Sequence, residues 1–463
     1  MFVDQWLTAE ADMQPKNPFW NLGLEYLLAG NPEQRRPVAK RVVQIFLSGA
    51  ASSVDLYDYK PVLEQRRGQP FDPGGKLELF QSQPGVVMPS AWGFERSGQS
   101  GRWMSKILPQ LAKCVDDMAF VYSMTSKSNV HGPATFLQTT GFVQPGFPSM
   151  GAWIAHGLGS LTENLPVFVA LPDSRGVPPN GPANWGAGFL PAATQGVVIR
   201  PGSQTAIRDL QPPSGNNASP TEVARQRFLA DINRLDARQH GSDDALIARI
   251  KSHQLAAKLQ LSAPEAMDIS KESSATRQLY GIGNQQTNDL GTRCLVARRL
   301  LERGVRFVQI WSGADNGFPR RNWDSHEDLR KDHADMATEL DTPVAGLLRD
   351  LKSRGLLDDT IVLCTSEFGR MPCSQGGKGR DHNPEAFTTW LAGGGIKGGS
   401  DIGATDEWGY KVAQNPVTGY DVHATVLALL GVDHTSLTFR HNGVNRRLTD
   451  VHGHVLKQLI KQV

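Results

Sequence analysis

Short apolar runs alternate with stretches of helical periodicity along the chain. Continuous apolar runs predict buried strands at 41–47, 118–124, 166–171, 305–311, 360–366 and 388–391. Between them, apolar positions recur at helical spacing and predict helices at 20–28, 103–114, 133–139, 150–158, 294–303, 328–354 and 420–430. Strands that alternate with helices in this way predict an α/β fold, a mostly parallel sheet sandwiched between helices.

The composition changes along the chain and suggests its division. Residues 1–38 form an irregular segment, and residues 39–463 form a single domain. Within this domain, 172–220 is rich in Pro, Gly and Asn, which predicts a long surface excursion. Apolar residues at helical spacing follow up to Leu261, and we interpret 221–285 as a helical insertion beside the sheet.

Composition and charge exclude several classes of protein. Of the 463 residues, 39% are hydrophobic and 20% are charged, which is typical of a globular protein. The net charge is +2 and the basic residues are dispersed, which argues against nucleic acid as a partner. No apolar run approaches the roughly 20 residues of a membrane-spanning helix, so no membrane partner is expected.

The N-terminal segment and the cysteines indicate the location of the protein and the state of its thiols. The N-terminus has no basic segment followed by an apolar one, which predicts a cytoplasmic protein, or an exported one if a signal has been trimmed. The four scattered cysteines are expected to be free thiols: Cys114, Cys294, Cys364 and Cys373.

The segment Asn322-Trp-Asp-Ser-His326 is the first candidate for chemistry. It follows a predicted strand and precedes the long helix, where Asp324 and His326 can converge on one cation. A carboxylate oxygen and an imidazole nitrogen suit zinc, manganese or iron better than calcium or magnesium. In the alternative interpretation, Asp324 caps the helix and His326 is a surface residue.

Two further candidates follow the strand at 360–366. Glu367 lies where the strand meets a glycine turn, a common position for a ligand or an acid, although it could instead pair with Arg370. In the Gly-rich segment that follows, Asp381 and His382 are adjacent and cannot face the same way. One of them is expected to face a metal, and the other to orient a ligand or to pair with Arg380.

The segment Ser128-Asn-Val-His-Gly-Pro133 lies between a predicted strand and a helix start. Helix N-termini attract anions, so Asn129 is a candidate donor to phosphate or sulfate. His131 is a candidate ligand, nucleophile or general acid, unless it only bonds to the backbone at the start of the helix.

After the first strand, Asp55 and Asp58 are candidate oxygen ligands. His423 is the weakest candidate, on a predicted amphipathic helix.

Several segments resemble the domain-of-unknown-function family numbered 1501. They cover most of the chain from about residue 40 onward: Ser123-Met-Thr, His131-Gly-Pro-Ala, 263–272, 298–308, Trp323-Asp-Ser-His, Ser366-Glu-Phe-Gly-Arg, Gly379-Arg-Asp-His, 392–399 and Gly403-Ala-Thr-Asp-Glu. This family is placed in the alkaline-phosphatase superfamily, beside sulfatases and metal-dependent phosphomutases. The resemblance therefore implies a parallel-rich sheet with metal ions at its carboxyl edge.

The resemblance also implies a set of metal ligands. In chain order, Asp324 and His326 match the superfamily's late Asp and His, and His382 matches its final His. Glu367 and Phe368 stand where an Asp-His pair is usual.

Other superfamily positions depart from the pattern. Ser48 stands where the first Asp is expected, which leaves Asp55 or Asp58 as substitutes, and the nucleophile position falls on His131. These departures imply one metal site with a full set of donors and a second site that lacks some.

We therefore expect a metal-dependent hydrolase of phosphate or sulfate esters, with a small-molecule or polymeric substrate. Zinc or manganese is favoured over calcium or magnesium. His131, Asn129 and Arg380 are the expected catalytic residues, with Arg380 stabilising charge that develops on the ester. Two alternatives remain: a weakly active or inactive relative that binds a sulfated or phosphorylated ligand, and a phosphomutase that would need Thr125, Ser126 or Ser128 as its nucleophile.

Overall fold

The computed structural model describes residues 37–75, 77, 79, 80, 83–203, 206, 207, 224, 228, 231, 232 and 263–461. The helix expected at 20–28 lies outside these residues. So does the helical run expected up to Leu261, apart from the four isolated positions 224, 228, 231 and 232.

A nine-stranded sheet forms the centre of the described structure, in the order β12-β4-β11-β8-β1-β7-β5-β6, with β15 also paired to β4. Its strands are β1 (Arg41–Leu47), β4 (Met118–Thr125), β5 (Phe168–Leu171), β6 (Val197–Val198), β7 (Phe307–Ser312), β8 (Thr360–Thr365), β11 (Phe387–Ala392), β12 (Asp401–Ile402) and β15 (Val417–Thr418). Only β11 runs antiparallel to its neighbours, β4 and β8. The prediction of a mostly parallel sheet is confirmed.

Strand β1 lies between β7 and β8 and is parallel to both. Val43 pairs with Val308 on one side and with Val362 on the other. Because parallel strands end at the same edge of a sheet, the loops after β1, β7 and β8 come together there.

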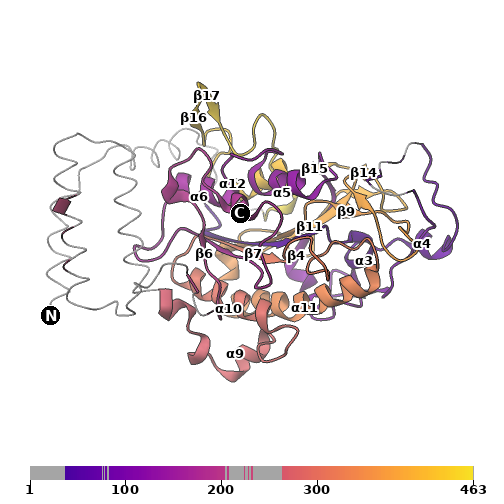
Figure 1. The fold of residues 1–463 in the computed structure, drawn as a ribbon, viewed down its shortest axis with the longest axis horizontal. Coiled ribbons are helices and arrows are strands. Elements are labelled where there is room, and N and C mark those ends of the chain that lie inside the picture. Colours follow the sequence, from indigo (N-terminus) through magenta and orange to yellow (C-terminus); the bar gives the residue numbers. More distant parts are fainter. Residues whose placement is uncertain are drawn as a thin grey trace.

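Helices cover both faces of the sheet (Figure 1). Helices α10 (Asn288–Glu302) and α11 (Leu329–Ser353) lie on one face, and α5 (His131–Thr140), α6 (Met150–Leu158) and α12 (Gly419–Leu429) lie on the other. Side chains of β1 alternate between two buried clusters, with Val43 and Ile45 in one and Val42 and Phe46 in the other. A strand buried on both faces explains why the sequence reads as a continuous apolar run.

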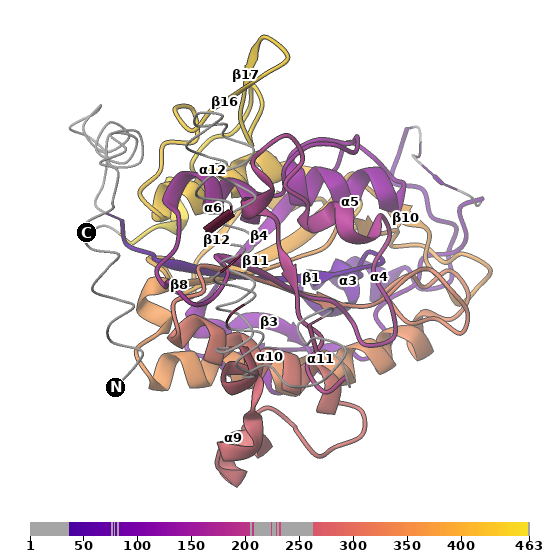
Figure 2. The same ribbon diagram turned by 60° about the vertical axis from the view of Figure 1, so that its left-hand side comes forward.

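Shorter elements surround the sheet. Among the described residues, shorter helices include α3 (Ser53–Leu56), α4 (Pro61–Gln65) and α9 (Ser274–Leu279), and short 3-10 helices span Leu111–Asp117, Gly181–Trp185, Ala192–Thr194, Ile269–Lys271, Leu357–Asp359 and Lys457–Leu459. Four two-stranded pairs are β2 (Phe94–Ser97) with β3 (Arg102–Ser105), β9 (Gly369–Arg370) with β10 (His382–Asn383), β13 (Ala404–Thr405) with β14 (Val412–Gln414), and β16 (Phe439–His441) with β17 (Val444–Arg446). The β16–β17 hairpin projects from the body (Figure 2).

The helix predicted at 103–114 is wrong. Residues 102–105 form strand β3, which pairs with β2 across a turn whose glycines, Gly98 and Gly101, have positive φ. Only a 3-10 helix follows, at Leu111–Asp117. Pro109 between these elements is incompatible with a helix interior, which explains the error.

The start of α5 and the segment 172–220 also differ from the prediction. Helix α5 begins at His131, two residues before Pro133, because proline is tolerated in the first turn, where backbone N–H groups need no helical partner. The segment expected to be a surface excursion carries edge strand β6 and a buried Trp185.

The four cysteines are free and buried, as expected. Among the helices in the described residues, none combines the length and apolar character needed to cross a bilayer.

The turn after β1 has no room for a side chain at Gly49, so Gly49→Ala is expected to destabilise the protein. The residue has φ +103°, and a Cβ there would lie 2.5 Å from the backbone nitrogen of Asp324. We expect the free energy of unfolding to fall by about 2 kcal/mol or more. Gly68→Ala is the matched control, since Gly68 has φ +76° but open space around it. Equal losses for the two variants in urea unfolding would show that the contact with Asp324 is unimportant.

Candidate metal centre

Loops at the carboxyl edge of the sheet bring four polar side chains together. Asp324 and His326 lie in the loop between β7 and α11, His131 is the first residue of α5 after β4, and His382 is on β10. One donor atom from each residue lies within 4.8 Å of the others. We call His131, Asp324, His326 and His382 the histidine–aspartate group.

The group is compact and centred on one carboxylate oxygen. Asp324 Oδ1 lies 3.0 Å from His326 Nε2, 3.4 Å from His131 Nε2 and 3.7 Å from His382 Nε2. The Nε2 atoms of His326 and His382 are 2.9 Å apart. His131, Asp324 and His382 are buried, and His326 is partly exposed.

The Nδ1 atom of each histidine, on the side of the ring away from the group, lies next to an oxygen acceptor. Nδ1 of His131 lies 2.7 Å from Glu367 Oε1. Nδ1 of His382 lies 2.6 Å from the carbonyl oxygen of Asn129, and Nδ1 of His326 lies 2.6 Å from Gln375 Oε1. Oxygen acceptors at Nδ1 place a proton on that nitrogen, which leaves the Nε2 lone pair of a neutral ring directed into the group.

This arrangement fits a bound cation. The buried Nε2 of His131 has no hydrogen-bond partner, since 3.4 Å to Asp324 is too long for a good hydrogen bond. Two ring-nitrogen lone pairs 2.9 Å apart, on His326 and His382, repel each other unless a proton or a cation lies between them. Three imidazole nitrogens and one carboxylate oxygen are donors that zinc prefers, whereas magnesium and calcium take oxygen ligands.

Asp324 is charged because two arginines face it. Oδ1 accepts a hydrogen bond from Arg370 Nη2 at 2.6 Å, and Oδ2 accepts one from Arg320 Nη1 at 2.8 Å. Burial opposes the charge, but Arg370 and the three histidines outweigh it and hold the pKa of Asp324 well below its usual range.

The surroundings affect two of the histidines in opposite ways. Burial and the charge of Arg370 outweigh the contact with Asp324 and lower the pKa of His382 to about 3. Burial also disfavours a charge on His131, but its contacts with Asp324 and Glu367 outweigh this and raise its pKa. A cation at Nε2 of His131 would compete with a proton for the same lone pair.

Aromatic rings enclose the group on one side. Phe80 stacks on His382 with ring centroids 4.5 Å apart, and Phe368 contacts both His382, at 4.7 Å, and His131, at 5.0 Å. An apolar wall of this kind limits solvent access and strengthens electrostatic interactions inside the site.

Glu367 and Asn129 lie beside the group and not in it. Both oxygens of the fully buried Glu367 are engaged, Oε1 by Gly49 N at 2.8 Å and by His131, and Oε2 by Ser366 Oγ at 3.1 Å. Glu367 thus holds a histidine, where a direct ligand was expected. Asn129 acts through its backbone carbonyl on His382, and no hydrogen bond from its side chain to the site is seen in the described residues.

Asp55 and Arg380 were expected at the site, and the structure pairs them with each other. They form a fully buried ion pair with each other, Arg380 Nε to Asp55 Oδ2 at 2.8 Å and Nη2 to Oδ1 at 3.2 Å. Arg380 also donates to the carbonyls of Met371 and Met88, so four of its five N–H groups are engaged, and its side chain is fully buried. Asp58 instead pairs with Lys60 at 3.1 Å.

His423 and the N-terminal cap of α11 have structural roles outside the group. His423 is buried on α12, with Nε2 2.9 Å from the carbonyl of Gln138. The long helix α11 is capped by Asp328, whose side chain accepts from Lys331 N, which leaves Asp324 free to join the group. Asp381 accepts from the backbone of Phe80 and His382, so the two adjacent residues do face different ways.

Three supporting residues were missed by sequence reasoning. Gln375 holds His326, and Arg320 pairs with Asp324. The fully buried His333 on α11 accepts from Ser52 N at 3.0 Å and lies 2.8 Å from Ser325 Oγ, so it links the helix to two of the site's loops. A histidine at an apolar-face position of the long helix was the only signal that could have identified His333.

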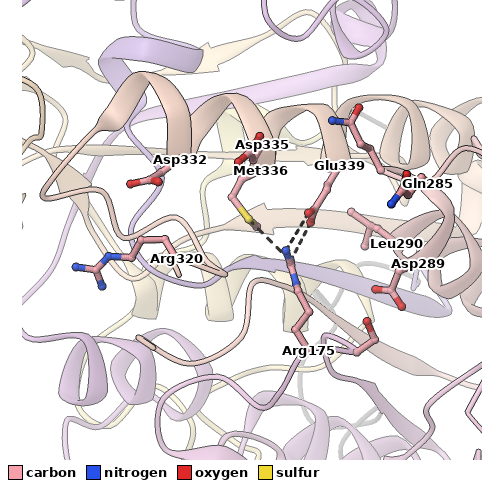
Figure 3. A pocket seen from close by; sticks show the side chains of 11 residues that line it. Arg175, Gln285, Asp289, Leu290, Arg320, Asp332, Asp335, Met336 and Glu339 are labelled. Atoms are coloured by element: carbon pink, nitrogen blue, oxygen red, sulfur yellow. Dashed lines mark hydrogen bonds and ion pairs between the residues drawn. The ribbon is translucent and has the colours of Figure 1, made fainter. Parts of the chain in front are cut away.

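A pocket of about 540 Å³ lies beside the first turns of α10 and α11, and one of its lining residues, Arg320, also pairs with Asp324. Arg175 extends across it to Glu339, at 2.8 Å, and to the sulfur of Met336 (Figure 3). Its charged lining is mainly acidic: Asp289, Asp332, Asp335 and Glu339 against Arg175 and Arg320.

The fold and the group define an α/β protein with a candidate metal centre at the carboxyl edge of its sheet. The chain belongs to the family described as "Protein of unknown function (DUF1501)", whose family model matches residues 39–460. No curated protein matches the chain.

Several solved structures are similar to the chain. LtaP, a lipoteichoic acid synthase from Listeria monocytogenes, is 10% identical, with 89% of this chain and 78% of that chain covered and a TM-score of 0.34. The PsFucS1 sulfatase from Pseudoalteromonas sp. is 13% identical, with 94% and 78% covered and a TM-score of 0.37. Alkaline phosphatase from the Antarctic bacterium TAB5 is 12% identical, with 78% and 92% covered and a TM-score of 0.32.

Removal of Asp55 is expected to destabilise the protein without removing a bound metal. In Asp55→Ala, Arg380 would stay buried without a counter-charge, and the free energy of unfolding should fall by about 3–5 kcal/mol. The double variant Asp55→Leu with Arg380→Met removes both charges and should lose less. A loss of metal content in the folded Asp55→Ala protein would instead show that Asp55 is a ligand.

Stability near the pocket should depend on pH through Asp332. Burial and the charge of Glu327 outweigh Arg320 and raise the pKa of Asp332 from 3.8 to about 6. The folded protein therefore binds more protons than the unfolded chain in this window, and the Asp332 carboxylate lowers stability as the pH rises from about 4 to 6. Asp332→Asn should gain stability relative to the parent over that window, with a constant difference above about pH 7. A difference in urea unfolding that is the same at every pH would contradict this prediction.

Proposed function

We propose that the protein is a metal-dependent hydrolase of phosphate or sulfate esters. The observation that carries the proposal is the convergence of three Nε2 atoms and one carboxylate oxygen, with each histidine held at Nδ1 by an oxygen acceptor. When a divalent cation is bound there, Lewis-acid polarisation of an ester oxygen becomes available. The donor set favours zinc, and imidazole-rich sites suit zinc or iron better than manganese.

The chain's own residues would prepare the site before any substrate arrives. Glu367, Gln375 and the Asn129 carbonyl fix the ring orientations, so that the lone pairs need no reorganisation on binding. Phe80 and Phe368 keep water from one side of His382. The start of α5 lies at the same edge, where its unpaired backbone N–H groups favour an anionic group. The ester would be a small molecule or part of a polymer.

A protein that binds a sulfated or phosphorylated ligand without cleaving it is the second candidate. Four protein donors complete a tetrahedral set, and metal sites closed in this way are typically structural, whereas catalytic zinc sites keep one position open. The two functions differ in whether Asp324 binds the metal. As a fourth ligand it would close the site, whereas its pairs with Arg370 and Arg320 could hold it away from the metal and leave one position open.

His382→Ala tests the proposed function directly. The variant loses one of three imidazole donors, so bound metal should fall below one per chain, and turnover of phosphate and sulfate esters should fall by at least about a hundredfold. Metal content by elemental analysis and turnover on a panel of both ester classes are the measurements.

His452→Ala is the matched control, since this exposed histidine contacts Lys127 and lies outside the group. Full metal content and full turnover in His382→Ala would refute the proposal. Stoichiometric metal in the parent protein, with no ester hydrolysed, would favour the binding protein.

A further inference from the structure

Ester hydrolysis needs a nucleophile, and the imidazoles of the group are poorly placed to supply one. His131 is held by Glu367 at Nδ1, 2.7 Å away, and its Nε2 faces Asp324 and the other ring nitrogens. His326 and His382 are held in the same way, at Nδ1 by an oxygen and with Nε2 turned inward. A ring nitrogen that faces a metal position cannot also attack an ester.

The carboxylates near the group are engaged as well. Arg370 and Arg320 each take one oxygen of Asp324. Glu367 is fully buried, and its oxygens are taken by Gly49 N, His131 and Ser366 Oγ. Neither carboxylate presents a free oxygen to an incoming ester.

Of the hydroxyl groups in the segment from the end of β4 to the start of α5, one is a candidate nucleophile. Ser128 Oγ bonds within its own turn to Val130, and Thr125 Oγ1 lies 3.5 Å from the carbonyl of Val417. Ser126 Oγ is buried and has no partner. Among these hydroxyl groups, a covalent route would therefore depend on Ser126, and an attack by His131 would require breaking its contact with Glu367.

We propose that His131 holds the metal and that the ester is cleaved by direct attack of water, with no covalent enzyme intermediate. This inference rests on the proposed hydrolase function. The water oxygen forms a bond to phosphorus or sulfur as the bond to the ester oxygen breaks. One proton of the water ends on the departing alcohol, and the other stays with the phosphate or passes from the sulfate to solvent. Glu367 is a positioning residue that acts through His131.

Measuring the affinity for Zn²⁺ tests whether His131 is a metal ligand, and the result does not depend on whether the protein hydrolyses esters. His131→Ala should bind Zn²⁺ at least about tenfold more weakly than the parent, measured by competition with a chelator, while His452→Ala should bind it equally well. If the alanine variant does not fold, Glu367→Gln keeps the imidazole and should still weaken Zn²⁺ about tenfold. Unchanged Zn²⁺ affinity in His131→Ala, or in Glu367→Gln where that variant stands in, would overturn the assignment.

The covalent route is tested on the zinc-loaded parent protein. During turnover of 4-nitrophenyl phosphate and 4-nitrophenyl sulfate, rapid quenching in acid and in base followed by mass spectrometry should find no added phosphoryl or sulfuryl group. Ser126→Ala should turn over both esters at the parental rate. A modified His131 or Ser126 that forms and decays as fast as turnover would overturn direct attack, and modified Ser126 would revive the phosphomutase.

The two proposals fail in different ways. If the parent binds zinc but hydrolyses neither ester nor any other ester of the panel, the hydrolase function fails, and direct attack fails with it. The zinc measurement on His131→Ala still decides whether this histidine is a ligand. If esters are hydrolysed through a covalent intermediate, the hydrolase function stands and only direct attack is lost.

Discussion

The site depends on one buried guanidinium, that of Arg370. It donates to the carbonyls of Gly49 at 2.5 Å, Ala50 at 2.9 Å and Arg380 at 3.1 Å, and to Asp324 at 2.6 Å. These partners belong to the loops after β1 and β7 and to the segment before β10, so a single side chain ties together segments that meet only through the fold. Without it, a buried carboxylate would lose its nearest counter-charge and three carbonyls would lose donors, both at considerable cost in free energy.

Around Arg370, the polar and the aromatic side chains of the site contribute in different ways. Oxygen acceptors behind the three histidines fix where the protons are, and the aromatic rings fix where water is excluded. Phe368 fills the space next to His131 and His382 with a hydrocarbon ring, which offers no donor to a second ion. Within the described residues, the group that could hold a metal ion is His131, Asp324, His326 and His382, whereas the sequence had led us to expect Glu367 and Asp55 among the ligands.

The sequence predicted the parts of the structure that depend on local pattern. Strand β1 and helix α6 have the predicted boundaries, because a strand buried on both faces and a regular helix leave clear apolar signatures. Asp324, His326 and His382 were grouped because their order along the chain matches the superfamily's ligands, and these three residues lie together in the structure. Pairing between distant residues was not predictable, and Arg380 finds Asp55 across 325 positions. Glu367 was read as a ligand because an acid at a strand end suits either coordination or hydrogen bonding, and only the position of His131 decides between them.

The inward-facing lone pairs of the histidines also have a consequence for the lifetime of the molecule. A cation bound to Nε2 of both His326 and His382, which lie 2.9 Å apart, would add its binding free energy to the stability of the folded protein. Binding only to the folded form would add about 4 kcal/mol to stability at a thousandfold excess over Kd, a large share of what holds a typical domain folded. Chains made when the metal is scarce would unfold more often and be the first to be degraded. The abundance of the protein would then follow the supply of its ion.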